Sequence, residues 1–230
     1  MATVRPVLEF ATRHDASRAA AGLAAEALRG ALKTGPRARL FASGGSTPVD
    51  MYDELSVYDL NWAEVDVALV DERCVPIDHV ASNARLVREH LLGGVAGRAT
   101  FHPMYLENGA SDVAGTYEAL MPADFIVLGM GLDGHTASWF PGAVNLQDTL
   151  ASGDTVAEID ATGCDVAGEF TRRLTLTRQA VARSNQGVLL IFGEPKRRVL
   201  DASFAQPVMD APIRAALEDL SNRLTIVWAP

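Results

Sequence analysis

Asp133 and His135 lie two residues apart in the glycine-rich segment FIVLGMGLDGHTASWFPG, which covers residues 125–142. A histidine among glycines has little apolar packing around it, so a chemical role explains it better than a place in the core. A carboxylate two residues away can orient the imidazole and keep it a base near neutral pH. The sequence therefore predicts a catalytic pair in which Asp133 orients His135.

Water is the expected attacking group, because the sequence offers no better nucleophile. No serine stands in a Gly-x-Ser-x-Gly elbow, and the two cysteines, Cys74 and Cys164, are far apart with no histidine at a suitable spacing. The sequence also lacks the His-Glu-x-x-His motif and the Cys/His clusters that bind metals. We therefore expect His135 to act on water without a metal or any other cofactor.

A second glycine-rich segment, ASGGSTP at residues 42–48, follows an apolar run and precedes a helical pattern. Its glycines allow a tight turn, its hydroxyl groups add donors, and its proline suits a first helical turn. Such a loop either cradles a phosphate or is an ordinary capped turn. It lacks the Gly-Lys-Ser/Thr ending of a nucleotide P-loop, which argues against an NTPase. The candidate phosphate-binding residues are Gly44, Gly45, Ser46 and Thr47.

Three charged residues, Asp71, Glu72 and Arg73, directly follow another apolar run at residues 65–70. Arg73 can grip an oxyanion with its rigid donor fork, and either carboxylate can hold substrate hydroxyl groups or orient the arginine. An ion pair that only closes the strand end is the alternative interpretation. We take Asp71 and Arg73 as candidate substrate-binding residues.

Basic residues are concentrated between Thr171 and Arg198, where seven arginines and lysines accompany one acidic residue, Glu194. Solvated helix faces account for most of them. Arg173 precedes an alternating apolar segment and Lys196 follows an apolar run, so both are placed to bind an anion at the edge of a sheet. The whole chain carries a net charge of −9, which predicts no general attraction to nucleic acid or anionic membranes.

These candidate residues follow or flank short apolar runs that are typical of buried strands. The runs cover residues 39–42, 65–70, 125–128, 188–192 and 224–228. Helical patterns lie between them, at residues 15–33, 48–58, 82–92, 112–120, 195–204 and 211–217. This alternation predicts an α/β fold with a mainly parallel sheet covered by helices on both faces. Such sheets bind ligands at the carboxyl ends of their strands, where these candidates stand.

The composition is that of an ordinary globular protein, with 48% hydrophobic and 21% charged residues among 230. Without an internal repeat or a long linker, we expect residues 1–230 to form a single domain. The first residues lack a signal-peptide pattern, no run of 18 apolar residues occurs, and a disulfide framework is not expected. We therefore expect a cytoplasmic protein with no membrane, nucleic-acid or obligatory protein partner.

Gly129, Gly131 and Gly134 formally match the Gly-x-Gly-x-x-Gly pattern of dinucleotide-binding folds. That pattern requires a helix of several turns after the third glycine, whereas Pro141 and Gly142 interrupt the chain here. It also normally opens the first βαβ unit, and here it lies in mid-chain. A nicotinamide-dependent oxidoreductase is therefore not expected.

Four segments together resemble the 6-phosphogluconolactonase family. They are ASGGSTP at 42–48, DERCVP at 71–76 with Ser82-Asn83, GMGLDGHTAS at 129–138 with Phe-Pro-Gly at 140–142, and RLTLT at 173–177. The segments occur in the family's order, and the resemblance extends from about residue 8 to residue 230. It implies a modified doubly wound, Rossmann-like α/β fold and the hydrolysis of 6-phospho-D-glucono-1,5-lactone to 6-phospho-D-gluconate in the oxidative pentose phosphate pathway.

The resemblance also implies roles for the residues already singled out. His135 corresponds to the general base. The phosphate site corresponds to Gly44–Thr47, Arg173 and Lys196, with Arg73 as a further anion or hydroxyl contact. The chain departs from the family at Trp139, where Leu is commoner, and at Arg172, where Pro or His is commoner. Both departures concern the shape of the pocket rather than the activity.

Two alternatives to lactone hydrolysis remain. Glucosamine-6-phosphate deaminase/isomerases are relatives that share the fold, the phosphate loop and an Asp-Gly-His motif. They carry Asn-Glu-Pro after the histidine, where this chain has residues 139–141, Trp-Phe-Pro, and they carry Tyr at the position of Arg73. The glutamate of their acid–base set is thus missing here. The other alternative is a catalytically silent sugar-phosphate sensor, against which the intact Asp133 and His135 pair argues.

Overall fold

A central sheet of parallel strands organises the structure, a computed structural model that describes residues 7–106 and 109–230. The strand order is β1–β10–β9–β6–β2–β3–β5, and every neighbouring pair runs parallel. These strands are β1 (Val7–Glu9), β2 (Ala38–Ala42), β3 (Val65–Leu69), β5 (Thr100–His102), β6 (Phe125–Leu128), β9 (Gln186–Phe192) and β10 (Leu224–Ala229). The predicted α/β fold with a mainly parallel sheet is confirmed.

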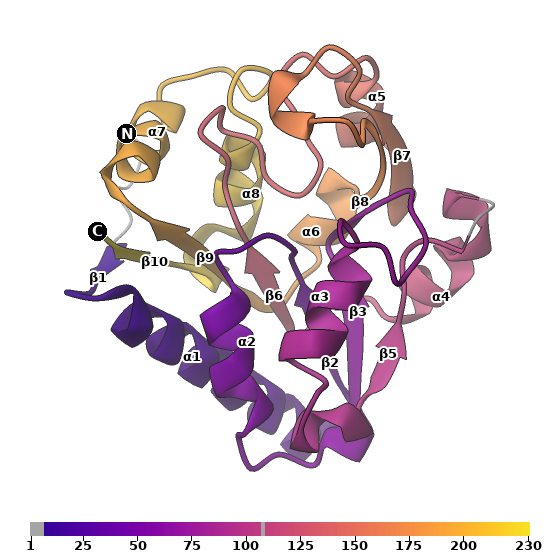
Figure 1. The fold of residues 1–230 in the computed structure, drawn as a ribbon, viewed down its shortest axis with the longest axis vertical. Helices are drawn as coiled ribbons and strands as arrows, with labels where there is room; N and C mark the ends of the chain where they lie inside the picture. Colours follow the sequence, from indigo (N-terminus) through magenta and orange to yellow (C-terminus); the bar gives the residue numbers. More distant parts are fainter. Residues whose placement is uncertain (1–6, 107–108) are drawn as a thin grey trace.

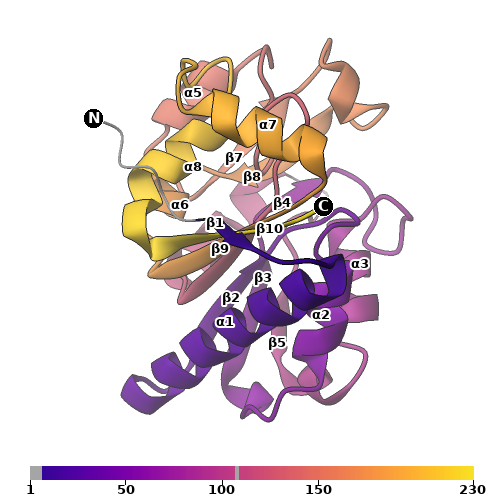
Figure 2. The same cartoon turned by 90° about the vertical axis from the view of Figure 1, so that its left-hand side faces the viewer.

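Helices cover both faces of this sheet, with α1, α2 and α3 on one side and α7 and α8 on the other (Figures 1 and 2). The α-helices are α1 (Arg13–Thr34), α2 (Val49–Ser56), α3 (Asn83–His90), α4 (Ala114–Ala119), α5 (Leu146–Ala151), α6 (Arg178–Ala182), α7 (Glu194–Ser203) and α8 (Ile213–Leu220). Short 3₁₀ turns are η1 (Trp62–Glu64), η2 (Val95–Arg98), η3 (Ala110–Asp112), η4 (Asp165–Ala167) and η5 (Ser221–Arg223). No helix in these two ranges is long and apolar enough to cross a membrane.

The long helix α1 shows how the sequence builds one of these layers. Its Thr12 cap accepts a hydrogen bond from the backbone N–H of Asp15, which satisfies one of the free donors of the first turn. Ala16, Ala20 and Ala24 recur every four residues and are fully buried. Small side chains at this spacing let the helix lie close against the sheet.

The strand order changes direction between β2 and β6. From β2 the chain builds outwards through β3 to β5, then returns to place β6 on the other side of β2 and continues through β9 to β10. This is a doubly wound topology. The loops that leave the two strands at such a switch point diverge, and the space between them is where ligands bind. The two glycine-rich segments of the sequence are these two loops.

A second, antiparallel sheet stands beside the first and was not predicted. Its order is β4–β8–β7, formed by β4 (Asp71–Arg73), β7 (Val156–Asp160) and β8 (Arg172–Leu176). β4 begins two residues after β3 ends, so the chain passes directly from the large sheet into the small one. The register pairs Arg73 with Arg173, and Asp71 with Thr175. This pairing brings together two candidate arginines that are 100 residues apart in the sequence.

Candidate active site

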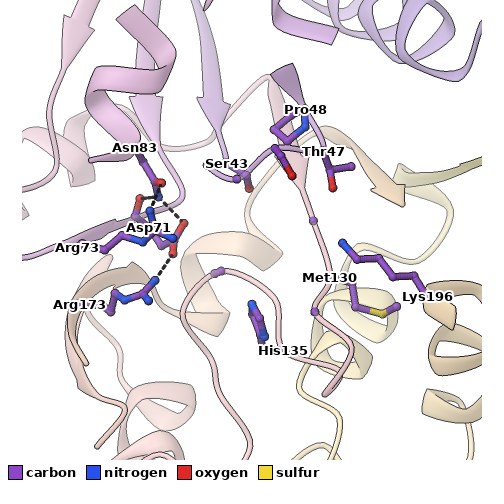
Figure 3. A pocket seen from close by; sticks show the side chains of 16 residues that line it. Ser43, Thr47, Pro48, Asp71, Arg73, Asn83, Met130, His135, Arg173 and Lys196 are labelled. Atoms are coloured by element: carbon purple, nitrogen blue, oxygen red, sulfur yellow. Dashed lines mark hydrogen bonds and ion pairs between the residues drawn. The ribbon is translucent and has the colours of Figure 1, made fainter. Parts of the chain in front are cut away.

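A cavity of about 240 Å³ opens at the carboxyl ends of β2 and β6 (Figure 3). All of the predicted site residues except Asp133 line it. The lining residues are Ser43, Gly44, Gly45, Ser46, Thr47, Pro48, Asp71, Arg73, Asn83, Gly129, Met130, Gly131, His135, Ala137, Arg173 and Lys196. Residues from five separate parts of the chain thus meet at the switch point of the sheet.

Asp133 forms a hydrogen bond with His135 and does not itself line the cavity. The carboxylate oxygen Oδ1 lies 2.6 Å from the imidazole Nδ1, and the same oxygen accepts the backbone N–H of His135 at 3.2 Å. Both side chains are about one-fifth exposed, at 21% and 23%. Burial raises the pKa of Asp133, but the hydrogen bond and charge of His135 outweigh it and lower that pKa overall. An ionised carboxylate on Nδ1 leaves Nε2 as the nitrogen available for chemistry.

The glycines around this pair are required for its geometry. A Cβ atom on Gly131 would lie 2.2 Å from Nδ1 of His135 and 2.4 Å from Oδ1 of Asp133. Gly134 has a φ of +82°, a conformation that side chains disfavour. The next helix, α5, begins only at Leu146. The Gly-x-Gly-x-x-Gly pattern therefore builds a tight turn around the histidine, and lacks the helix that a dinucleotide site needs.

Asp71 joins several parts of the cavity. Only 7% of the surface of this residue is exposed. One carboxylate oxygen, Oδ2, accepts a hydrogen bond from Ser138 at 2.7 Å and lies 4.0 Å from Nη1 of Arg173. The other, Oδ1, accepts one from Nδ2 of Asn83 at 3.2 Å. Asp71 therefore connects the loop that carries His135 to the small sheet, through its hydrogen bond with Ser138.

Arg173 is almost completely buried, with 5% of its surface exposed. Its Nε and Nη2 atoms donate to the carbonyl oxygens of Phe170 at 2.7 Å and Ala167 at 2.9 Å. The guanidinium also lies over the ring of Phe140, 5.3 Å from its centre. Burial lowers the pKa of Arg173, although Asp71 acts in the opposite direction. These contacts leave Nη1 as the atom that faces Asp71.

Glu72 has a structural position. Its carboxylate accepts backbone N–H groups of Asn83 and Ala84, each at 2.8 Å, and the hydroxyl of Ser82 at 3.0 Å. Burial raises the pKa of Glu72 against the effect of these hydrogen bonds. Glu72 therefore caps α3 and does not line the cavity. Of the two carboxylates that the sequence left open, only Asp71 reaches the site.

Lys196 enters the cavity from the opposite side to the arginines, with His135 between them (Figure 3). It belongs to the first turn of α7, which begins at Glu194. Among the described residues, its amino group has no hydrogen bond or ion pair. Burial lowers the pKa of Lys196. Several other arginines of the basic segment pair with surface carboxylates instead: Arg178 with Asp219, Arg183 with Glu118, and Arg197 with Glu9 and Asp201.

The loop between β2 and α2 is tied down at its start and open in its middle. The Ser43 hydroxyl donates to the carbonyl of Val127 at 2.6 Å, and Tyr52 donates to the carbonyl of Ser43 at 2.7 Å. Gly45 then takes a φ of +87°. Gly45 and Ser46 are exposed. The loop is thus fixed at Ser43 and presents its next residues to the cavity.

Sequence reasoning missed several lining residues, namely Ser43, Pro48, Asn83, Gly129, Met130, Gly131 and Ala137. Most of them adjoin a predicted residue on the same loop. Asn83 is different, because it is the first residue of α3 and reaches the cavity from a helix. Its signal in the sequence was its place directly after a helix-capping serine. No three His, Cys, Asp or Glu side chains in residues 7–106 and 109–230 are placed to share a metal ion.

The fold and the site together define a class: a doubly wound α/β protein with a histidine–carboxylate pair and cationic side chains at the switch point of its sheet. The model of one family, glucosamine-6-phosphate isomerases/6-phosphogluconolactonase, matches residues 11–228. The chain therefore belongs to the glucosamine-6-phosphate isomerase/6-phosphogluconolactonase family, as its four motifs indicated.

Relatives within this family are similar along most of the chain. A 6-phosphogluconolactonase from Mesorhizobium japonicum is 39% identical and covers 96% of this chain and 94% of its own. One from Xylella fastidiosa is 38% identical over 84% of this chain and 82% of its own. The crystal structure of a 6-phosphogluconolactonase from Shewanella baltica superposes with a TM-score of 0.92, at 34% identity and 99% coverage of both chains. A monomeric glucosamine-6-phosphate deaminase, at 20% identity and a TM-score of 0.78, shares the fold alone.

Proposed function

We propose that this chain is a lactonase that hydrolyses 6-phospho-D-glucono-1,5-lactone to 6-phospho-D-gluconate, the reaction that belongs to the oxidative pentose phosphate pathway. The observation that carries this proposal is the Asp133–His135 pair at 2.6 Å, set in a cavity with cationic side chains on both sides. The relatives named 6-phosphogluconolactonase, at 38% and 39% identity, support it.

The reaction begins with water between His135 and the lactone carbonyl. Nε2 of His135 takes a proton from the water as its oxygen attacks C1, which gives a tetrahedral oxyanion. The imidazolium then returns the proton to the ring oxygen as the C1–O bond breaks, and the product is the open-chain acid. Asp133 stabilises the imidazolium during this sequence. General base catalysis of this kind typically contributes about 10² to 10⁴ in rate, which suits an already activated ester. The reaction needs no cofactor.

The cations on the two sides of His135 suit the two ends of this substrate. Lys196 and the Gly44–Thr47 loop hold the phosphate group, so that binding energy far from C1 positions the reacting carbon. Arg73 and Arg173 lie on the other side with Asp71, where Arg173 stabilises the oxyanion and Arg73 binds oxygen atoms of the lactone and of the carboxylate that it opens to. We therefore assign Arg173 to this side, instead of to the phosphate site that the family resemblance implies.

Unphosphorylated gluconolactone distinguishes the two ends. A Lys196→Ala variant should lose activity mainly towards the phosphorylated lactone, because its contact with the phosphate is gone. An Arg173→Lys variant should lose activity towards both lactones by similar factors. If the Arg173 variant instead loses only the preference for the phosphorylated lactone, Arg173 belongs to the phosphate site, as the sequence suggested.

Hydrolysis itself is tested by acid release, measured against the spontaneous opening of the lactone. Wild-type protein should accelerate the reaction, and His135→Ala should reduce kcat at least 10²-fold, at the low end of what general base catalysis typically contributes, about 10² to 10⁴. Calorimetric affinity for 6-phosphogluconate should stay within a few-fold, since the anion contacts remain. No acceleration by micromolar wild-type protein would reject the proposed function, and full activity of His135→Ala would reject the base.

The environment of His135 also bears on deaminase activity. Trp139 and Phe140 follow His135 by four and five residues, are buried, and carry no carboxylate. The Trp139 indole N–H donates to the carbonyl of Leu176 at 2.8 Å, which fixes it in the core. No acid–base group is supplied there for proton transfer between sugar carbons. Glucosamine 6-phosphate should therefore release no ammonia, and ammonia release would favour the deaminase.

The remaining sequence predictions form part of the same proposal. Residues 1–230 constitute one domain that acts on a small phosphosugar lactone in the cytoplasm. Its reaction requires no membrane, nucleic acid or obligatory protein partner. Turnover of the purified chain alone tests the prediction about partners, because a required partner would leave the isolated protein inactive.

A further inference from the structure

The side chain of Asn83 lies where three parts of the site meet. It is the first residue of α3, it touches the β2–α2 loop at Gly44, and it bonds to Asp71 and Arg73 of β4. Only 2% of its surface is exposed. A buried carboxamide with both ends hydrogen-bonded has little freedom to move.

The hydrogen bonds of Asn83 fix the direction of its amide. Nδ2 donates to the backbone carbonyl of Asp71 at 2.8 Å and to the carboxylate of Asp71 at 3.2 Å. Both of these partners only accept, so the amide cannot be reversed without losing both bonds. Oδ1 is therefore an acceptor, and it receives Nη1 of Arg73 at 3.1 Å. Asp71 thus sets the orientation of Asn83, and Asn83 in turn holds Arg73.

This contact leaves one edge of Arg73 unused. Nη1 donates both to Asn83 and to the carbonyl of Ala81 at 2.6 Å, which accounts for its two hydrogens. Nε is buried without a partner, and within residues 7–106 and 109–230 Nη2 has no hydrogen bond either. A buried N–H without an acceptor is unfavourable unless a ligand supplies one.

Other arginines of the same chain show what this edge can bind. Arg37 uses Nε and Nη2 to grip Asp66 at 2.5 and 2.9 Å. Arg178 grips Asp219 in the same way, at 2.6 and 2.8 Å. The Nε–Nη2 edge matches the two oxygens of a carboxylate. In Arg73 the equivalent edge is free, and Arg73 lines the cavity.

The backbone of Asn83 and its contact with Gly44 are equally constrained. Glu72 accepts the backbone N–H of Asn83 at 2.8 Å, so the start of α3 is fixed to β4. A Cβ atom on Gly44 would lie 1.8 Å from Oδ1 of Asn83, which shows how closely the loop packs against the amide. Asn83 therefore also sets the distance between Arg73 and the β2–α2 loop.

We propose that Asn83 is a positioning residue that holds Arg73 with its Nε–Nη2 edge free for an oxyanion of the substrate or product. The inference rests on the proposed function only in naming that ligand, a sugar lactone that opens to a carboxylate. Asn83 acts through Arg73, so its removal affects binding of the anion more than the chemistry at His135.

The test combines Asn83→Ala with Arg73→Ala and both changes together, read as KM, kcat and the calorimetric affinity for 6-phosphogluconate. Asn83→Ala should raise KM and weaken product binding about tenfold, as expected for loss of a hydrogen bond to a charged group, with kcat changed less. In the Arg73→Ala background the same change should have an effect below about threefold, because the residue through which Asn83 acts is absent. Equal losses in both backgrounds, or an unchanged KM, would overturn the proposal.

Ser82→Ala is the matched control. Ser82 caps the same helix, bonds to Glu72 at 3.0 Å, and does not line the cavity. It should lower the Tm but leave KM unchanged, which separates weakening of α3 from loss of the Arg73 contact. If Asn83→Ala fails to fold, Arg73→Lys replaces it. The lysine keeps the charge but lacks the two-pronged edge, so product affinity should fall about tenfold if the edge binds the anion, and an unchanged affinity would contradict the proposal.

A measurement without ligand keeps this result separate from the proposed function. The Nε–H signal of Arg73 in a ¹⁵N NMR spectrum, assigned by its loss in Arg73→Lys, should shift or broaden in Asn83→Ala and stay in place in Ser82→Ala. If wild-type protein fails to hydrolyse the lactone while this pattern is seen, the function is wrong and the positioning role stands. An unshifted signal in Asn83→Ala would reject the positioning role whatever the activity.

Discussion

Replacing Asp133 tests the central element of the proposed mechanism. In Asp133→Ala, the imidazolium that forms at His135 loses a carboxylate whose oxygen lies 2.6 Å from Nδ1. With charge centres about 4 Å apart, their attraction is about 4 kcal/mol at an effective dielectric constant of about 20 and about 1 kcal/mol in bulk water. These limits correspond to losses of about 10³-fold and about fivefold in rate. Because both side chains are mostly but not fully buried, at 23% and 21% exposed, we expect about 10²-fold.

Asp133→Asn should be at least as damaging, although it keeps the shape of the side chain. An asparagine can turn its NH₂ group towards Nδ1, which would move the imidazole proton to Nε2. Nε2–H cannot accept a proton from water, so the base would be lost. The corresponding Asp→Asn change in a Ser-His-Asp triad lowers kcat by about 10⁴.

The assay is acid release by purified variants, corrected for spontaneous lactone opening, together with calorimetric binding of 6-phosphogluconate. Product affinity should stay within a few-fold of wild type for both variants of Asp133, because the anion-binding side chains are untouched. If either variant retains more than about one-third of the wild-type kcat, a change worth less than about 1 kcal/mol, the carboxylate does not act through His135 and the reasoning fails.

Three further changes test other parts of the structure. In Gly131→Ala the added methyl group would lie 2.2 Å from Nδ1 of His135. The variant should therefore lower kcat at least tenfold, which corresponds to about 1.4 kcal/mol in the activation free energy, with a smaller effect on Tm. An unchanged kcat would show that the loop moves to accommodate the methyl group. Burial lowers the pKa of Lys196, so its positive charge is lost at a lower pH than that of an ordinary lysine. The calorimetric affinity for 6-phosphogluconate should therefore decline between about pH 7 and about pH 10 in the wild type, and decline less in Lys196→Arg. Identical pH profiles of the two proteins would argue against a charge contact with the phosphate. Burial raises the pKa of Asp66, but the hydrogen bond and charge of Arg37 and other neighbouring groups lower it overall. Ionised Asp66 therefore stabilises the fold at pH values above the usual carboxylate pKa. This stabilisation is lost as the pH falls through the lowered pKa of the folded protein. Urea unfolding of Asp66→Asn should therefore depend less on pH than that of wild type between about pH 5 and about pH 2, and parallel curves would refute the assignment.

The parallel sheet could be predicted because its inner strands are buried on both faces and contain almost only apolar residues. β3 (Val65–Leu69) and β6 (Phe125–Leu128) are buried at every position. The strands at the two edges were missed. β1 (Val7–Glu9) and β5 (Thr100–His102) have three residues each, with exposed or half-buried side chains. An edge strand that is partly exposed to solvent has few apolar residues, so its sequence does not show a recognisable strand pattern. Its pairing depends on strands that are distant in the sequence.

The small sheet was missed for a different reason. β4 consists of Asp71, Glu72 and Arg73, three charged residues that are typical of a loop in isolation. They form a strand because Asp71 and Glu72 find buried partners in other segments, including Asn83 and Ser138. Such partners lie 10 or more residues away, where local patterns do not reach.

Most of the residues that we propose for the site could be chosen from the sequence, because their chemical identity does not depend on an exact secondary structure. His135 and Lys196 follow apolar strands that bring them to one edge of the sheet. What local patterns could not supply is the direction of each side chain. Asp133 contacts Nδ1 of His135 and does not line the cavity, whereas Asn83 lines the cavity from the start of α3.

The position of β10 has a consequence for how the chain reaches its native state. Among the residues that the structure describes, β1 pairs with β10 alone, and β10 lies between β1 and β9. During synthesis, Val7–Glu9 leaves the ribosome more than 200 residues before its partner strand Leu224–Ala229 exists. β1 therefore has no partner strand until Leu224–Ala229 has been synthesised. Contacts between such distant segments slow folding, so completion of this edge is expected to be a late step, after the strands that carry the site have already assembled.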